Sequence, residues 1–458
     1  LIERAKVKLF PCLLRLKSDL FHLLFIELNY LWIMIIGILF CLLLLLALTF
    51  SIQKSRFFKI RSIPKSWIWM AFSLKLIAAL TLTSIYTYYY QNRSQADIYK
   101  YYDDAVVLKK AHQDKSDLFW ETFLPENMQS ESFRHSLSQT LHWDLSTTYL
   151  INDNRTLIRL NYLLLYLSGE FYFFHLLFFC TLSFLGSIAL FRFFNANSSL
   201  PSQLIFIVVF GVPSLLFWSS ALLKESILLF TLGFFLLFAQ KVFIKNQLKF
   251  LPLFIVFLFL SFTVKIYVFL ALAIPLLLYL ISQRLSIKKQ KAAYSIIGIS
   301  LIALFFSLKN KLLITLKEKL IDFKAIAEAA NAGSQIYMPT YENLSELIQL
   351  IPLALYNVLI HPLIPPKWSL LSSVAAMEHL FLVGILVLPI IAFKKQTKQL
   401  PFFWFCISFV LILSCLIGLS TPVLGAIVRY KVPLIPFYLI ALLTFVNLNK
   451  IPLLKKLK

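Results

Sequence analysis

Charged side chains are scarce in this 458-residue chain, at 14% of residues, and the acids are scarcest, with 21 Asp and Glu against 44 Lys and Arg. Its apolar runs lack the alternation of apolar and polar residues that a transmembrane β-barrel requires, which excludes that class. The five cysteines are scattered without a CxxC pair, so neither a disulfide nor a cysteine metal site is supported. No internal repeat is visible, which weakens the case for an inverted-repeat transporter.

Long apolar runs fill the sequence instead, many of them near the length of about 20 residues that crosses roughly 30 Å of hydrocarbon. They predict an all-α polytopic membrane protein with about 11 transmembrane helices. The net charge of +23 comes largely from short loops that contain Lys and Arg but no acid, the pattern of cytoplasmic loops. We therefore expect a lipid bilayer, and no nucleic acid, as partner. The loops are 54–65, 241–249, 284–291, 394–398 and the residues from 450 onward.

The remaining segments divide the chain into an amphipathic N-terminal piece, 1–28, and a single transmembrane domain, 29–458. Two large loops are expected on the outer side, and the Pro-broken stretch 346–372 is expected to be re-entrant or to lie in the interface. The run 157–192 is too long for one crossing, so we expect its first turns to stand outside the bilayer or to form a separate helix. The two outer loops are 90–155, after the second span, and 309–345.

The stretch "ADIYKYYDDA" opens the acidic outer loop 90–155, which holds ten of the 21 acids. On a helix, Asp97 and Asp104 share a face, with Asp103 beside it. Adjacent carboxylates disfavour each other's ionisation, so one could act as a base with a raised pKa. Alternatively, the pair could share a divalent cation such as Mg²⁺ or Mn²⁺. A solvated acidic loop or a helix cap is the simpler alternative.

Two cations lie at the predicted outer ends of spans, against the cytoplasmic bias of the other basic residues. Lys224, followed by Glu225, falls in a tight turn where its ammonium could hold a lipid phosphate beside helix N-terminal amides. Arg429, followed by Tyr430, opens the last span, and its planar fork suits phosphate oxygens. Anchoring to the membrane interface is the alternative for both.

A second basic pair lies where the acidic loop meets the next span. Arg155 and Arg159 are four residues apart and share a helix face, which makes them further phosphate candidates. Glu378 and His379, at the head of a later span, are candidates because ionisable groups inside a membrane are costly unless they have a function or a partner. Pairing within the helix bundle is the alternative.

An acidic loop with an Asp-Asp pair after an early span, many further spans and a final outward "RYKVPLIPF" resemble the GT-C superfamily of integral membrane glycosyltransferases. The arrangement is also similar to bacterial polysaccharide polymerases of the EpsG and Wzy type. The GT-C resemblance implies transfer of a sugar from a polyprenyl-phosphate donor to an envelope glycan, lipid or protein. It places this chemistry on the periplasmic or outer face of the cytoplasmic (inner) membrane. Its members usually carry the acidic loop after the first span, whereas here the loop follows the second.

The resemblance also assigns a role to the acidic stretch. Asp103 or Asp104, with Asp97 next, would be the base or metal ligand. Because transfer from such a donor needs cations that stabilise the departing phosphate, we expect Lys224 and Arg429 to bind it, with Arg159 and Arg155 as further candidates. Secondary candidates are Glu225, Glu378, His379 and Tyr430. A polysaccharide polymerase, a flippase or transporter of lipid-linked glycans, and a membrane scaffold remain alternative functions.

Overall fold

Helices make up the regular structure of this protein. The computed structural model describes residues 31–90, 93–114, 122–123, 137–143, 152–329, 335–361, 363, 370–395 and 397–451. Within these ranges there are no named strands, only isolated bridges. The predicted amphipathic segment 1–28 lies outside the described residues.

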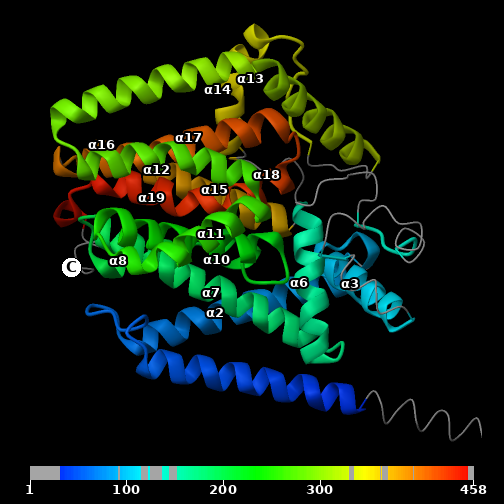
Figure 1. The fold of residues 1–458 in the computed structure, drawn as a ribbon. Coiled ribbons are helices and arrows are strands. Elements are labelled where there is room, and N and C mark those ends of the chain that lie inside the picture. Colours follow the sequence, from blue (N-terminus) through cyan, green and yellow to red (C-terminus); the bar gives the residue numbers. More distant parts are fainter. Residues whose placement is uncertain are drawn as a thin grey trace, which may run out of the picture. The chain divides into compact units, whose positions relative to one another are not determined.

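The described chain begins with the helix Leu31–Lys54, and short 3-10 and π turns join several of the later helices. The later α-helices are α2 (Lys65–Ser84), α3 (Asp97–Asp114), α6 (Asp153–Ser168), α7 (Tyr172–Asn197), α8 (Ser202–Phe210), α9 (Pro213–Trp218), α10 (Lys224–Ala239), α11 (Leu251–Val264), α12 (Ile266–Arg284), α13 (Ile287–Ala329), α14 (Leu344–Leu359), α15 (Leu370–Ile385), α16 (Leu388–Ile391), α17 (Leu400–Ser420), α18 (Leu424–Tyr430) and α19 (Ile435–Thr444) (Figure 1).

Nine helical segments of the described chain are long and apolar enough to cross a membrane. The prediction of a polytopic helical membrane protein is thereby confirmed, while the count of about 11 spans and the GT-C fold stay predictions. Two shorter apolar helices, Leu248–Val264 and Leu344–Leu359, add to the nine. The nine are Leu31–Lys54, Lys65–Tyr89, Tyr172–Asn197, Lys224–Ile244, Ile266–Arg284, Lys288–Glu328, Ser372–Ile391, Thr397–Ser420 and Leu424–Thr444.

Contacts within the chain define two compact units. The first comprises Leu1–Phe57 and Tyr86–Phe178, and the second comprises Phe58–Ile85 and Phe179–Lys458. In the first unit, α3 packs along α6. In the second, α17 packs against α12, α14 and α19, and α10 packs against α11 (Figure 1). The second unit therefore has a helical bundle centred on α17.

The long apolar run expected at 157–192 is divided between α6 and α7. Asn152 caps α6, because its side-chain oxygen accepts a hydrogen bond from the amide of Asn154 at 2.8 Å. Gly169 ends the helix with φ at 59°, and Glu170 follows with φ at 83°. Two successive residues in this region of backbone space cannot continue a right-handed helix. The break therefore gives α7 its own start at Tyr172.

The expected outer loop 309–345 is helical up to residue 329, because α13 continues without interruption from residue 287. Leu316 and Leu320 are one helical turn apart and pack in a buried cluster with Tyr341 and Leu347. The cluster also includes Leu419 of α17, so this part of the chain is held against α17. Its location outside the membrane stays a prediction, as does the interfacial location of the stretch that begins with α14.

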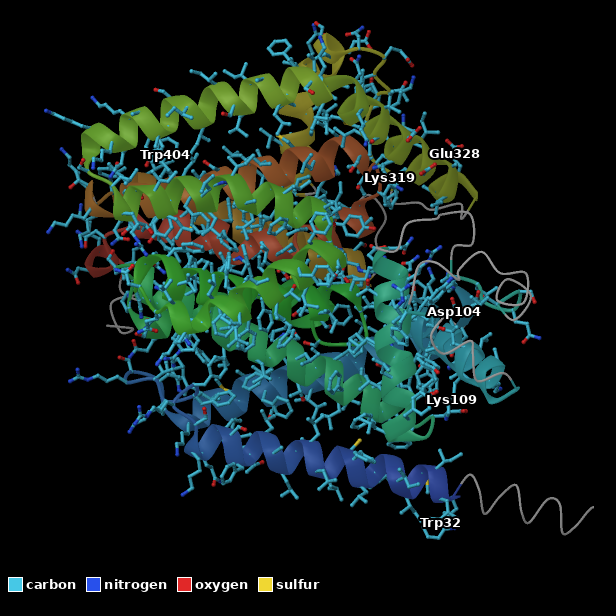
Figure 2. The ribbon with its side chains drawn as sticks, viewed as in Figure 1. Trp32, Asp104, Lys109, Lys319, Glu328 and Trp404 are labelled. Carbon is cyan, nitrogen blue, oxygen red and sulfur yellow. The ribbon has the colours of Figure 1, made fainter. Side chains whose placement is uncertain are left out.

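Outward-facing side chains of the spans are largely apolar. Trp32 and Trp404 are 62% and 60% exposed (Figure 2). No residue of the most apolar stretch of α13 is buried within the protein. Exposed apolar surface on this scale fits a lipid environment.

Two glycines allow α7 and α10 to approach closely in the second unit. A Cβ added at Gly186 would lie 2.3 Å from the Cα of Phe230, and one added at Gly233 would lie 2.1 Å from the carbonyl oxygen of Gly186. Such distances are far below contact, so only residues without a side chain fit here.

We expect Gly186→Ala to lower the free energy of unfolding by about 1–3 kcal/mol, since the two helices must move apart to admit the methyl group. The midpoint of thermal unfolding in detergent measures the effect. Gly298→Ala is the matched control, because an added Cβ there meets nothing within 4 Å. Equal midpoints for the two variants would contradict the close approach.

Candidate functional site

The three candidate carboxylates of the acidic stretch all lie on α3, in the first unit. Asp97 forms an ion pair with Lys100, one turn further on, at 2.8 Å. Asp103 forms a two-bonded pair with Arg93, whose Nε and Nη2 donate to its two oxygens at 2.9 and 2.7 Å. The side chains of Arg93 and Asp103 are 55% and 38% exposed, so solvent reaches this pair. Asp103 is thus available to chemistry outside the helix.

Asp104, labelled in Figure 2, is the next residue but has a different environment. It is buried, and its two oxygens accept hydrogen bonds from the backbone amides of Leu141 and His142 at 3.0 and 2.8 Å. Burial raises the pKa of Asp104, while these hydrogen bonds act in the opposite direction. The geometry makes Asp104 an anchor that holds residues 141–142 against α3.

Arg155 and Arg159 lie on one side of α6 and share an aromatic partner. The guanidinium carbon of each lies 5.4 Å from the ring of Trp143, a cation–π arrangement. Arg159 also donates from Nε to the carbonyl oxygen of Thr122 at 2.7 Å. Burial, together with the charge of Arg155, lowers the pKa of Arg159 to about 10, so it remains protonated at neutral pH. These contacts tie α6 to Thr122 and Trp143 of the first unit.

A buried histidine links α6 and α7. The Nδ1 of His175 lies 2.8 Å from the side-chain oxygen of Asn161, and its Nε2 lies 2.8 Å from the hydroxyl of Ser168. Both ring nitrogens therefore have partners within the helix pair. His175 therefore has a structural role: it holds α7 against α6 on either side of the break at Gly169.

In the second unit, a buried ion triad joins three helices. Glu225, in the first turn of α10, accepts a hydrogen bond from Lys265 at 2.7 Å and forms an ion pair with Arg429 of α18 at 2.9 Å. Lys265 directly precedes α12. The side chains of Glu225, Lys265 and Arg429 are only 1%, 4% and 11% exposed. We call these three residues the triad.

Aromatic rings surround the triad. The ammonium of Lys265 lies 4.5 Å from the ring of Tyr430, and the guanidinium of Arg429 lies 6.0 Å from the ring of Trp218. The triad therefore has two cations for one carboxylate, buried from solvent and beside aromatic rings. Such an excess of buried positive charge favours the approach of an anion.

The remaining sequence candidates of the second unit are Lys224, Glu378 and His379, which adjoin or contact α10, α9 and the end of α18. Lys224 is the half-buried first residue of α10, beside Glu225. Glu378 accepts hydrogen bonds from the amide and hydroxyl of Ser214 in α9 at 2.7 and 2.5 Å. His379 lies 2.5 Å from the ammonium of Lys431, the residue that follows Tyr430. These contacts bind α15 to α9 and to the end of α18.

Sequence reasoning missed two buried lysines of the second unit. Lys265 separates two apolar runs, and its position at a predicted outer turn, like that of Lys224, was the signal that could have identified it. Lys75 lies inside the span formed by α2, where it donates to the hydroxyls of Ser183 and Ser219 at 2.8 Å each. The sequence signal for Lys75 was a single Lys within an apolar run.

The carboxylates of Asp103 and Asp104 are not arranged as ligands of a divalent cation. Within the described ranges, no group of three or more His, Cys, Asp or Glu side chains is arranged to hold a metal. The oxygens of Asp103 face Arg93, and those of Asp104 face two amides. The residues as placed do not form a metal site, so we derive no step through a metal ion, and its use stays a prediction.

The geometry thus singles out two features, the solvent-facing Asp103 of the first unit and the buried triad of the second. The residues of the triad lie far apart in the sequence. Asp103 differs from its neighbour Asp104 because the two side chains point in different directions from α3. Comparison with known proteins adds no assignment to either feature. No protein-family model, no curated protein and no solved structure matches the chain.

Proposed function

We propose that the protein is a membrane glycosyltransferase that uses a polyprenyl-phosphate sugar and acts on a glycan, lipid or protein at the outer face of the cytoplasmic membrane. The observation that carries the proposal is the triad, with two buried cations against one carboxylate. A phosphate with a lipid tail would balance this charge while its tail remains among the spans. The aromatic rings beside the triad suit the sugar or the first units of the lipid.

Arg429 and Lys265 have the stabilising role in this proposal. When the bond between the anomeric carbon and the phosphate oxygen breaks, the electron pair stays on the phosphate. Cations fixed in a site of low water content stabilise that developing charge without reorganisation. The guanidinium of Arg429 offers several donors in one plane, and Lys224 supplies a further positive charge.

The proposal assigns proton acceptance to a carboxylate of α3. Asp103 is the best suited, because its side chain is 38% exposed and Arg93, with which it pairs, is itself 55% exposed. The acceptor hydroxyl must give its proton to a base while its oxygen bonds the anomeric carbon, and the GT-C resemblance of the sequence makes Asp103 or Asp104 the candidate for that base. Asp104 would act as a positioning residue, since both of its oxygens accept backbone hydrogen bonds.

Arg429→Lys tests the proposal while keeping a positive charge next to Glu225. Membranes containing the chain are supplied with a radiolabelled polyprenyl-phosphate sugar, and transfer to extracted envelope material is measured. We expect kcat/KM to fall roughly ten- to hundredfold, because ammonium cannot replace the planar donor set on phosphate.

Lys319→Gln is the matched control, since Lys319 is an exposed cation on α13 (Figure 2). Its transfer rate should equal that of the unmodified protein. Unchanged transfer by Arg429→Lys would remove the triad from the donor site. Lack of transfer by the unmodified chain with every polyprenyl-phosphate sugar supplied would contradict the proposed activity itself.

A further inference from the structure

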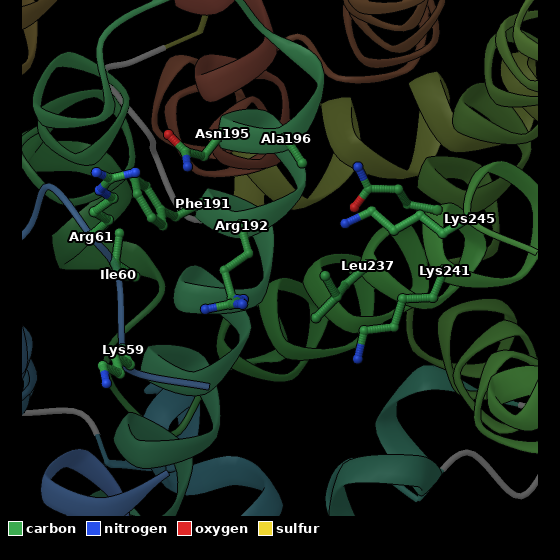
Figure 3. Close-up of a pocket in the computed structure, with 11 residues that line it drawn as sticks. Lys59, Ile60, Arg61, Phe191, Arg192, Asn195, Ala196, Leu237, Lys241 and Lys245 are labelled. Atoms are coloured by element: carbon green, nitrogen blue, oxygen red, sulfur yellow. The ribbon is translucent and has the colours of Figure 1, made fainter. Parts of the chain in front are cut away.

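A pocket of about 220 Å³ lies within the second unit, at the end of α10 opposite to the first turn that carries Glu225 of the triad. Three segments form it: the turn before α2, the last turns of α7, and the end of α10 with the π turn Gln240–Ile244. The residues lining it are Lys59, Ile60, Arg61, Phe191, Arg192, Asn195, Ala196, Leu237, Gln240, Lys241 and Lys245 (Figure 3).

Five of these residues are cations, and none is an acid. Figure 3 shows Lys59 and Arg61 on one side of Arg192, and Lys241 and Lys245 on the other. Like charges that face one cavity repel each other, and a bound anion relieves that repulsion. Cations that only anchor a helix in the interface have no reason to converge on one cavity. The convergence therefore points to an anionic ligand.

The other lining residues indicate what kind of anion fits. Ile60, Phe191 and Leu237 give the pocket an apolar part, and the buried Gln240 adds a polar group. An amphipathic lining suits a headgroup that is attached to a hydrocarbon chain better than it suits a free inorganic ion.

The position along the chain supports a membrane source for the ligand. Lys59 and Arg61 belong to the basic loop 54–65, and Lys241 and Lys245 belong to the basic loop 241–249. The positive-inside rule assigns both loops to the cytoplasmic face. Anionic phospholipids supply negative charge at that face, and basic pockets between spans bind their headgroups.

We propose that this pocket binds the phosphodiester headgroup of an anionic phospholipid of the cytoplasmic leaflet. The cations contact the phosphate oxygens, and the apolar residues contact the start of the lipid chains. The inference goes beyond the proposed function and does not depend on it, because none of the pocket residues belongs to the triad or to α3.

Native mass spectrometry of the full chain in detergent, titrated with phosphatidylglycerol and separately with phosphatidylcholine, tests the proposal. We expect preferential binding of phosphatidylglycerol. In Arg192→Gln/Lys241→Gln its affinity should fall roughly tenfold or more, since each cation near an anionic lipid surface contributes on the order of fivefold. Lys59→Gln/Arg61→Gln should give a similar loss of affinity. Both residues are exposed, so these substitutions should not disturb the fold.

Lys395→Gln/Lys398→Gln is the matched control, because it removes two exposed cations of another predicted cytoplasmic loop that do not line the pocket. It should keep the preference for phosphatidylglycerol. An equal loss in all three double variants would assign the effect to general surface charge and overturn the proposal. Inorganic phosphate that displaces the lipid at a comparable concentration would overturn the lipid as ligand and identify a soluble anion instead.

Discussion

Glu225→Gln is expected to lower the free energy of unfolding by about 3–5 kcal/mol, the largest loss of stability that we predict for a single side chain here. Glu225 is the carboxylate that pairs with both Lys265 and Arg429, at 2.7 and 2.9 Å. Glutamine keeps the volume but removes the charge, so two buried cations lose their counterion. The midpoint of unfolding in a detergent titration, followed by tryptophan fluorescence, measures the change.

An exposed ion pair of the same kind serves as the control for this variant. Glu342 pairs with Lys317, and its side chain is 70% exposed. Because water screens this pair, Glu342→Gln should change the stability by only about 0–1 kcal/mol. If Glu225→Gln were as mild as Glu342→Gln, water would have to reach the triad, and the excess buried charge that supports donor binding would be lost as an argument.

Asp103→Asn is expected to reduce sugar transfer by about 10²–10⁴-fold, because the amide cannot accept the proton of the acceptor hydroxyl. The ion pair with Arg93 is partly exposed to water, so this substitution should lower the free energy of unfolding by only about 1 kcal/mol. Initial rates with a polyprenyl-phosphate sugar, measured alongside the unfolding midpoint, separate loss of chemistry from loss of fold.

Asp97→Asn is the matched control on the same helix, since it also removes one carboxylate from an ion pair on the surface of α3. It should retain most of the transfer activity. A large loss in Asp97→Asn with normal rates in Asp103→Asn would transfer the proposed role to Asp97. A loss of activity in Asp104→Asn that follows its loss of stability would fit a positioning role for that residue.

The roles of the two adjacent aspartates illustrate how far sequence reasoning extends. The Asp-Asp pair stood out because acids are rare in this chain and are concentrated in one region. Neighbouring residues on a helix point about 100° apart, so one side chain can face solvent while the next is buried. Which of the two is buried depends on where residues 141–142 pack, and no local pattern reveals that.

The sequence by itself determined the class of the protein, because long apolar runs and loops rich in Lys and Arg are local properties of the chain. It also identified Glu225 and Arg429 as unusual charges next to spans. Only the tertiary structure decided that Glu225 meets Lys265, 40 residues further on, and Arg429 of a later helix. The physical reason is that helix partners are chosen by side-chain packing over whole surfaces, as at Gly186 and Gly233, and hydrophobicity along one helix does not encode which helix lies beside it.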